Sequence, residues 1–395
     1  MASKEVLTEV GKGTDRQESG RLVSLDVFRG ITIAGMILVN NPGDWSHVYW
    51  PLLHAEWSGW TPTDLIFPFF LFIVGVAMPY SFARRLSNGG SRGKLLRHIV
   101  VRSLIIFALG MMLSGIPNFN YSHRLILSTL QRIAVIYLMS GTIYMFSGVV
   151  AQVVVAVFCI ALYWALMLWV PVPGYGAGIL TPVGNMWWYM DKILLQGWHQ
   201  HLFVIGNYTL HHAEGILSLI PSISTVLFGS LTGHYLRSDR SRIEKAAGMM
   251  VAGNFGLVIG IIMSIWFPIN KLLWSSSYVV FTAGFALEFL GVCYWLIDIK
   301  GYKKWSEPFL VFGSNAITVF FLSGLVAIIL DLVVVVAAGP AGATLRMTLK
   351  EYLFGAVFAP VAGPYNASLL FAIAYVLIWY AVMYVFYKKK IFIKV

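Results

Sequence analysis

Ten apolar stretches recur along this chain, and each is long enough to cross a lipid bilayer as a helix. A spanning helix needs about 20 apolar residues, and only helices and closed barrels satisfy every backbone hydrogen bond inside a bilayer. The pattern therefore predicts an all-α fold, a polytopic transmembrane helical bundle of about ten spans. The stretches cover residues 25–42, 65–85, 99–115, 127–147, 150–170, 214–236, 247–267, 274–297, 309–336 and 366–387.

Charged residues are too scarce for a soluble globular protein. Of the 395 residues, 11% are charged and 58% are hydrophobic, whereas a soluble chain carries about 25% charged residues. The two cysteines, Cys159 and Cys293, both fall in apolar stretches. Their number and placement exclude a disulfide framework and a thiolate metal site.

The basic residues are distributed unevenly among the segments that join the spans. Alternate segments, together with both ends of the chain, hold 21 of the 28 Lys and Arg. Because basic segments stay in the cytoplasm, we expect both termini there, residues 1–21 as a disordered tail and residues 171–213 as a long extracytoplasmic loop. The net charge of +11 then reflects membrane orientation and contact with anionic lipid, without a nucleic-acid partner.

A polar loop rich in tryptophan and tyrosine joins the first two spans and carries His54. The aromatic residues fit either an interfacial belt or a platform on which a sugar stacks. Taken alone, His54 fits either an ordinary interfacial histidine or a catalytic base. Thr61, Pro62 and Asp64 form the N-cap and first turn of the second span, so Asp64 can cap that helix and orient His54 as well.

Two arginines lie inside predicted spans, where a charge usually faces a cavity or a partner. Asp26 and Arg29 are one helical turn apart and can form an ion pair, or Arg29 can hold a coenzyme phosphate or pantetheine group. Arg132 is either a functional residue that faces the bundle interior or one half of an ion pair. Its candidate partners are Asp26, Asp64 and Glu214.

The long loop at 171–213 is rich in Gly, Pro and Trp, and a loop of this length is usually a lid or a binding element. It contains four histidines, His199, His201, His211 and His212. Such histidines raise the question of a zinc site. The His-x-His spacing suits a strand better than a loop, so we expect no metal.

Several sequence motifs follow one another along the chain, from the first apolar stretch to the C-terminus. They are SLDVFRG from Ser24, LVN ending at Asn40, HAEWSGWTPTDLIFPFFLFIVG from His54, LQRIAVIY around Arg132, EGILSLIPSI from Glu214, INKLLWSSSYV from Ile269, GSNAI around Asn315 and YKKKIF near the C-terminus. Together they resemble the heparan-α-glucosaminide N-acetyltransferase family, whose members are membrane acetyl-CoA:amino-sugar acetyltransferases. The resemblance covers nearly the whole chain and implies one transmembrane acyltransferase domain over residues 22–395.

The resemblance also implies which residues form the site. His54 would be the general base or a transient acetyl carrier, Asn40 an oxyanion donor, and Asp64 the acid that orients His54. Acetyl-CoA would be the co-substrate, and no metal is implied. The coenzyme would be bound by Arg29, Arg132 and Asn315. We expect Glu214 to bind the acceptor sugar together with Asn270, Lys271 and Trp274, which begin the eighth predicted span from the outside. The alternative for Lys271 is an interfacial anchor.

One motif departs from the family pattern. Where the family typically has Asp-Pro-Glu-Gly, this chain has His212-Ala213-Glu214-Gly215. The Glu and Gly match, but the Asp and Pro do not, and this leaves the natural acceptor open.

The resemblance implies an enzyme that moves the acetyl group of cytoplasmic acetyl-CoA to the amine of a glucosamine-type sugar or glycan on the extracytoplasmic side. It would be a multi-pass protein of a bacterial inner membrane, in contact with lipid, and a homodimer is compatible with it. Two alternatives stay open. One is an amino-sugar transporter, although the internal repeats and paired interrupted helices typical of transporters are not evident in the sequence. The other is an O-acyltransferase acting on envelope glycans.

Overall fold

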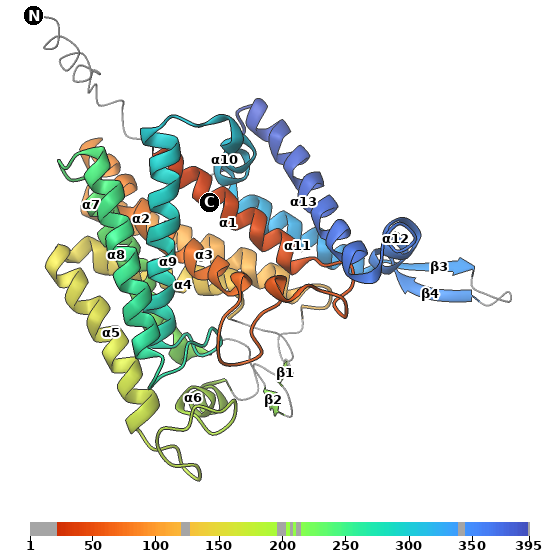
Figure 1. Cartoon of the computed structure of the whole chain (residues 1–395), viewed down its shortest axis with the longest axis horizontal. Helices are drawn as coiled ribbons and strands as arrows, with labels where there is room; N and C mark the ends of the chain where they lie inside the picture. The colour runs from red at the N-terminus through yellow and green to blue at the C-terminus, as the bar shows by residue number, and fades with distance from the viewer. Residues whose placement is uncertain are drawn as a thin grey trace, which may run out of the picture.

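The computed structural model describes residues 22–119, 127–195, 203–205, 208–210, 215–338 and 344–393. These residues are mainly helical and carry two small hairpins (Figure 1). The expected N-terminal tail, residues 1–21, lies outside them. The helices are α1 Val23–Asn40, α2 Pro62–Ser87, α3 Arg92–Gly115, α4 Thr129–Phe146, α5 Val149–Trp169, α6 Met186–Leu194, α7 Leu219–Leu236, α8 Arg242–Met263, α9 Ser276–Tyr294, α10 Glu307–Ser314, α11 Ala316–Leu332, α12 Leu349–Leu353 and α13 Pro364–Lys388. The strands are β1 Phe203–Ile205, β2 Tyr208–Leu210, β3 Val334–Ala338 and β4 Thr344–Thr348.

The predicted class, an all-α multi-pass membrane bundle, is confirmed. Within the described residues, eight helices are long and apolar enough to cross a membrane, and α10 with α11 brings the number to nine if the two form one span. Helix α4 fills the predicted window 127–147 but does not reach the same apolarity. The expected total of ten spans and the cytoplasmic placement of both termini therefore stay predictions.

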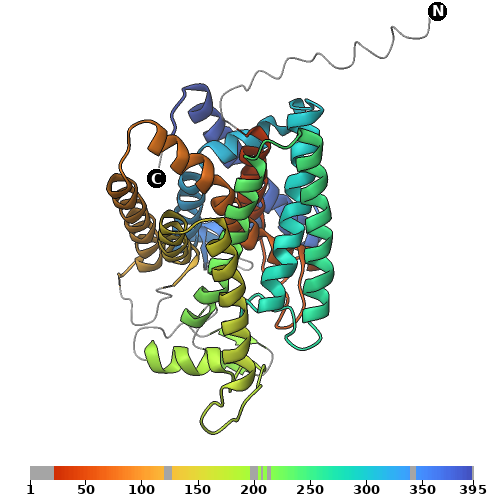
Figure 2. The same ribbon diagram turned by 90° about the vertical axis from the view of Figure 1, so that its left-hand side faces the viewer.

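Helices α2 and α7 form the centre of the bundle. Two-thirds of the spanning part of each is buried, against 22% for α5 and α8, which lie on the outside (Figure 2). The two central backbones approach each other closely, because a Cβ atom on Gly75 would lie 2.0 Å from the carbonyl oxygen of Val226. Small residues allow such close crossings in membranes.

The predicted span at 309–336 is broken in the structure. Helices α10 and α11 meet at Asn315 with a bend of 74°, and α11 ends at Leu332, so the last residues of the predicted span form strand β3. That strand pairs with β4 in an antiparallel hairpin. A run of β-branched valines at 333–336 favours the strand, and hydropathy alone does not distinguish it from helix.

The helix ends fall into two groups at opposite ends of the bundle. At one end, the backbone N–H of Gly59 donates to the carbonyl of Ile269 at 2.7 Å and joins the loop at 41–61 to the turn before α9. At the other end, the guanidinium of Arg237 donates to the carbonyl of Pro79 at 2.9 Å, and the N–H of Ser24 donates to Asp298 at 3.2 Å. The basic segments around α2–α3, α7–α8 and α9–α10 thus share this second end.

Candidate active site

The start of α2 fixes a buried carboxylate. Thr61 precedes the helix, Pro62 occupies its first position, and Asp64 lies in its first turn. One carboxylate oxygen of Asp64 accepts the backbone N–H groups of Thr61 and Ala55, each at 3.0 Å. Its position at a helix N-terminus also favours a negative charge. The predicted capping role of Asp64 is therefore visible in its contacts.

The other carboxylate oxygen of Asp64 holds His54. The distance from Nδ1 of His54 to Oδ1 of Asp64 is 2.7 Å. The side chain of Asp64 is 1% exposed and that of His54 is 50% exposed. The Asp64 carboxylate accepts two backbone N–H groups, so it also acts as the acceptor toward the His54 ring. The ring nitrogen that faces it must then be the donor, and in a neutral His54 the proton is on Nδ1. Nε2 then carries the lone pair.

Lys271 completes this group of three side chains. Its Nζ lies 3.1 Å from Nδ1 and 3.0 Å from Nε2 of His54, and 3.8 Å from Oδ1 of Asp64. Lys271 and His54 are 217 residues apart in the sequence. The hydrogen bond between Gly59 and Ile269 brings their two segments together. The sequence assigned Lys271 to the acceptor, and its contact with His54 appears only in the fold.

A second histidine–aspartate pair lies in the same loop. Nδ1 of His47 is 2.6 Å from a carboxylate oxygen of Asp44, and this hydrogen bond holds the pKa of Asp44 below its usual value. Asp44 is 35% exposed, so solvent weakens the hold of this carboxylate on its histidine. The burial of Asp64 therefore distinguishes His54 from His47.

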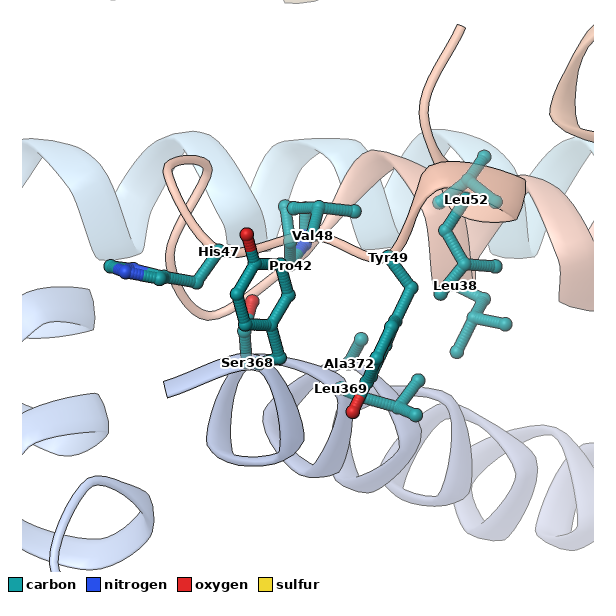
Figure 3. Close-up of a pocket in the computed structure, with 11 residues that line it drawn as sticks. Leu38, Pro42, His47, Val48, Tyr49, Leu52, Ser368, Leu369 and Ala372 are labelled. Atoms are coloured by element: carbon teal, nitrogen blue, oxygen red, sulfur yellow. The ribbon is translucent and has the colours of Figure 1, made fainter. Parts of the chain in front are cut away.

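His47 borders a small, mainly apolar pocket between the end of α1 and the start of α13 (Figure 3). The ring of Tyr365 stands edge-on to the ring of His47 there, with centroids 5.3 Å apart. His54 does not line this pocket. The lining residues are Leu38, Val39, Pro42, His47, Val48, Tyr49, Leu52, Tyr365, Ser368, Leu369 and Ala372.

Asn40 lies exposed at the end of α1. The neighbouring Asn41 is buried and donates from its side chain to the carbonyl of Ile37 at 2.7 Å. The described side-chain contacts of His54 are with Asp64 and Lys271 and do not include Asn40. A role for Asn40 as an oxyanion donor stays a prediction.

Trp274 belongs to the turn that carries Lys271, and Arg132 packs against the ring of Trp274. The guanidinium of Arg132, which is 1% exposed, stands 5.0 Å from the ring centre of Trp274 and donates to the hydroxyl of Ser222 at 3.2 Å. Trp274 is fully buried and donates to Thr225. Asn270 is also buried, and its side-chain oxygen accepts the N–H of Leu273 at 2.8 Å. The observed contacts of Trp274 and Asn270 shape this turn, and their predicted contact with a sugar stays a prediction.

Arg29 and Asn315 are at the other end of the bundle. Arg29 forms the expected ion pair with Asp26 at 3.0 Å, near the Ser24–Asp298 contact. The side-chain amide of Asn315 donates to the carbonyl of Ile391 at 3.0 Å and accepts the N–H of Ile393 at 2.8 Å. Asn315 thus anchors the C-terminal segment. The three residues assigned to the coenzyme do not meet at one point, so their joint role in binding it stays a prediction.

Glu214, the remaining acceptor residue, lies outside the described residues, as do the four loop histidines. Among the residues that the structure does describe, no three or more His, Cys, Asp or Glu are grouped so that they could hold a metal ion. Gly215 is described, and its neighbour in space is Asp191 of α6. A Cβ atom at residue 215 would lie 1.8 Å from a carboxylate oxygen of Asp191, which explains the glycine of the Glu-Gly motif.

Sequence reasoning did not assign a role to Asp191, the only acid of its loop. Its side chain is buried and accepts the N–H of Ile216 at 2.9 Å. Burial raises the pKa of Asp191 to about 7, while that hydrogen bond and the charge of Arg132 act in the opposite direction. Asp191 therefore ties α6 to the start of the α7 segment through a carboxylate that titrates near neutral pH.

These features define a multi-pass α-helical membrane protein with a histidine, held by a buried carboxylate, at one end of its bundle. The model of the catalytic region of heparan-alpha-glucosaminide N-acetyltransferase matches residues 21–260, which include His54 and Asp64. The chain belongs to the heparan-alpha-glucosaminide N-acetyltransferase family, as its motifs predicted.

Two relatives carry this family name. The heparan-alpha-glucosaminide N-acetyltransferase of Mus musculus is 29% identical over 360 residues, covering 78% of this chain and 54% of the relative. That of Homo sapiens is 30% identical over 352 residues, covering 76% of this chain and 52% of the relative. The chain thus spans about half the length of the curated relatives it matches.

Proposed function

We propose that this protein transfers the acetyl group of acetyl-CoA to the amine of a glucosamine-type sugar, with His54 as the general base. The observation that supports this proposal most directly is the hydrogen bond of 2.7 Å between His54 and the buried Asp64. Both residues lie within the region that matches the family's catalytic model. The acetyl-CoA would approach from the cytoplasm and the sugar from the opposite side of a bacterial inner membrane.

Acyl transfer to an amine needs a base to remove a proton as the nitrogen attacks. The hydrogen bonding of His54 leaves the lone pair of Nε2 for this purpose, while Asp64 fixes the ring and favours the positive charge that develops on it. The same lone pair could instead attack the thioester and carry the acetyl group. Incubating the protein with labelled acetyl-CoA alone, followed by a search for label bound to His54, distinguishes the two routes.

The test is the transfer of labelled acetyl groups to glucosamine by purified protein. Loss of a general base typically costs about 10²- to 10⁴-fold in rate, so we expect His54→Ala to lose at least that much. His47→Ala is the matched control, because His47 lies in the same loop and is also paired with an aspartate. We expect its rate to stay within about threefold of the wild type, well short of the loss of a base.

Three results would contradict the proposal. If His54→Ala keeps a rate within about tenfold of the wild type, below the range for a lost base, His54 is not the base. If wild-type protein moves glucosamine across vesicle membranes without acetylating it, the transporter alternative holds. An O-acetylated product would instead support the glycan O-acyltransferase. The His212-Ala213 departure makes a panel of amino sugars necessary in this assay.

A further inference from the structure

The distances between Lys271 and His54 restrict where the ammonium group can lie relative to the imidazole ring. Its Nζ is almost equally distant from the two ring nitrogens, at 3.0 Å and 3.1 Å. An atom in the ring plane at these distances would overlap Cε1, the carbon between the two nitrogens. The ammonium group therefore lies over the face of the imidazole. In that position it leaves the in-plane lone pair of Nε2 open to a substrate.

The surroundings hold the ammonium group in this place. The side chain of Lys271 is only 14% exposed, and its Nζ is 3.8 Å from the carboxylate of Asp64. The turn beneath it is fixed by the buried Asn270, whose backbone N–H donates to the hydroxyl of Ser275 at 3.0 Å. A charge fixed before the reaction needs little reorganisation to stabilise a developing negative charge.

We propose that Lys271 is a catalytic residue that donates a hydrogen bond to the oxyanion of the tetrahedral intermediate. This inference rests on the proposed acyl transfer and replaces contact with the acceptor sugar as the main task of Lys271. When the amine of the sugar is within hydrogen-bond reach of Nε2, its nitrogen lies beside the edge of the imidazole ring. The acetyl carbonyl that bonds to this nitrogen can then point back over the ring face, toward the ammonium group of Lys271.

The amine nitrogen forms a bond to the acetyl carbon, and the carbonyl electron pair moves to oxygen, where Nζ–H of Lys271 donates to it. Nε2 of His54 takes the proton that the amine loses. The oxyanion then re-forms the carbonyl, the carbon–sulfur bond breaks, and the thiolate of the leaving coenzyme takes the proton from Nε2. The products are an amide and a thiol.

Lys271→Met removes the charge while it nearly keeps the length of the side chain. Loss of one oxyanion donor costs about 10²- to 10³-fold in kcat, so we expect that loss, with the KM for the amino sugar within about threefold of the wild type. Lys192→Met is the matched control, since Lys192 is exposed on α6. An acceptor-binding lysine would show the opposite split, with a raised KM and a retained kcat, and this result would overturn the proposal.

A second variant keeps the test decisive if Lys271→Met does not fold. Lys271→Cys can be alkylated with 2-bromoethylamine, which restores an ammonium group on a chain of nearly the same length. The native Cys159 and Cys293 are both buried, and treated wild-type protein controls for their reaction. We expect alkylation to recover at least about tenfold in kcat, a part of the value of an oxyanion donor. Equal rates before and after alkylation would overturn the proposal.

Asn40→Ala, measured in parallel, compares the two predicted oxyanion donors. A loss of kcat confined to Asn40→Ala would transfer the role from Lys271 to Asn40. If wild-type protein forms no acetylated product at all, the proposed function itself fails. An active wild type with an unaffected Lys271→Met overturns only the inference about Lys271.

Discussion

At the scale of single residues, the site depends on the two separate oxygens of Asp64. Oδ2 accepts backbone N–H groups of the loop and of the helix start, and Oδ1 accepts Nδ1 of His54. The same carboxylate thus caps α2 and orients His54. In contrast, the carboxylate of Asp44 holds His47 on the surface, where water competes for both partners.

Burial of Asp191 predicts a dependence of stability on pH. The pKa of Asp191 rises from 3.8 to about 7 in the folded protein, so the folded state binds this proton more tightly than the unfolded state. Its stabilising effect is therefore complete below pH 4 and is lost as pH rises toward 7 and above. The difference corresponds to roughly 4 kcal/mol. We expect the melting temperature in detergent to fall between pH 5 and pH 8.

Asp191→Asn isolates this contribution, because an amide does not titrate. We expect the fall between pH 5 and pH 8 to become shallower in this variant. The exposed Asp239→Asn makes the same change of charge on the surface and should retain the slope of the wild type. A wild-type slope in Asp191→Asn would show that other groups cause the pH dependence.

At the scale of elements, the crossing of α2 and α7 depends on glycine. A Cβ at residue 75 would meet the backbone of Val226 at 2.0 Å, whereas one at Gly324 of α11 would meet only the end of the Leu113 side chain at 3.4 Å. The same added methyl group therefore forces two helices apart at residue 75 and fits at residue 324.

We expect Gly75→Ala to destabilise the protein by roughly 1–3 kcal/mol, the usual effect of overpacking. Gly324→Ala should be neutral or slightly stabilising, because alanine is the better helix former. Thermal unfolding in one detergent, with the two variants side by side, measures the difference. Similar melting temperatures for both variants would mean that the central crossing can widen without loss.

The sequence predicted the helices well because a long apolar run leaves few alternatives in a bilayer. It did not predict the break at Asn315, since the partners of that side chain, Ile391 and Ile393, lie more than 70 residues away. The candidate site shows the same difference between contacts that are local in the sequence and contacts that are distant in it. Motif and spacing identified His54 and Asp64, which are close in the chain. The contact of Lys271 with His54 depends on the folded turn before α9, and hydropathy and motif spacing carry no information about it.

At the scale of the whole molecule, the bundle has an end that carries His54 and an end that carries the basic segments. Which end faces the cytoplasm is a prediction from the distribution of basic residues, with 21 of 28 assigned to one side. Ser58 is exposed in the loop that carries His54, and Asn88 is exposed between α2 and α3 at the basic end. These two residues therefore report on opposite sides of the membrane.

We expect a membrane-impermeant maleimide to label Ser58→Cys in spheroplasts of a bacterial host and to label Asn88→Cys only after the membrane is permeabilised. Both native cysteines are buried, so the background should be low. The positive-inside rule is the physical reason for this orientation. The reverse labelling would place His54 on the cytoplasmic side. Coenzyme and acceptor would then meet in one compartment, and a transmembrane path for the acetyl group would no longer be needed.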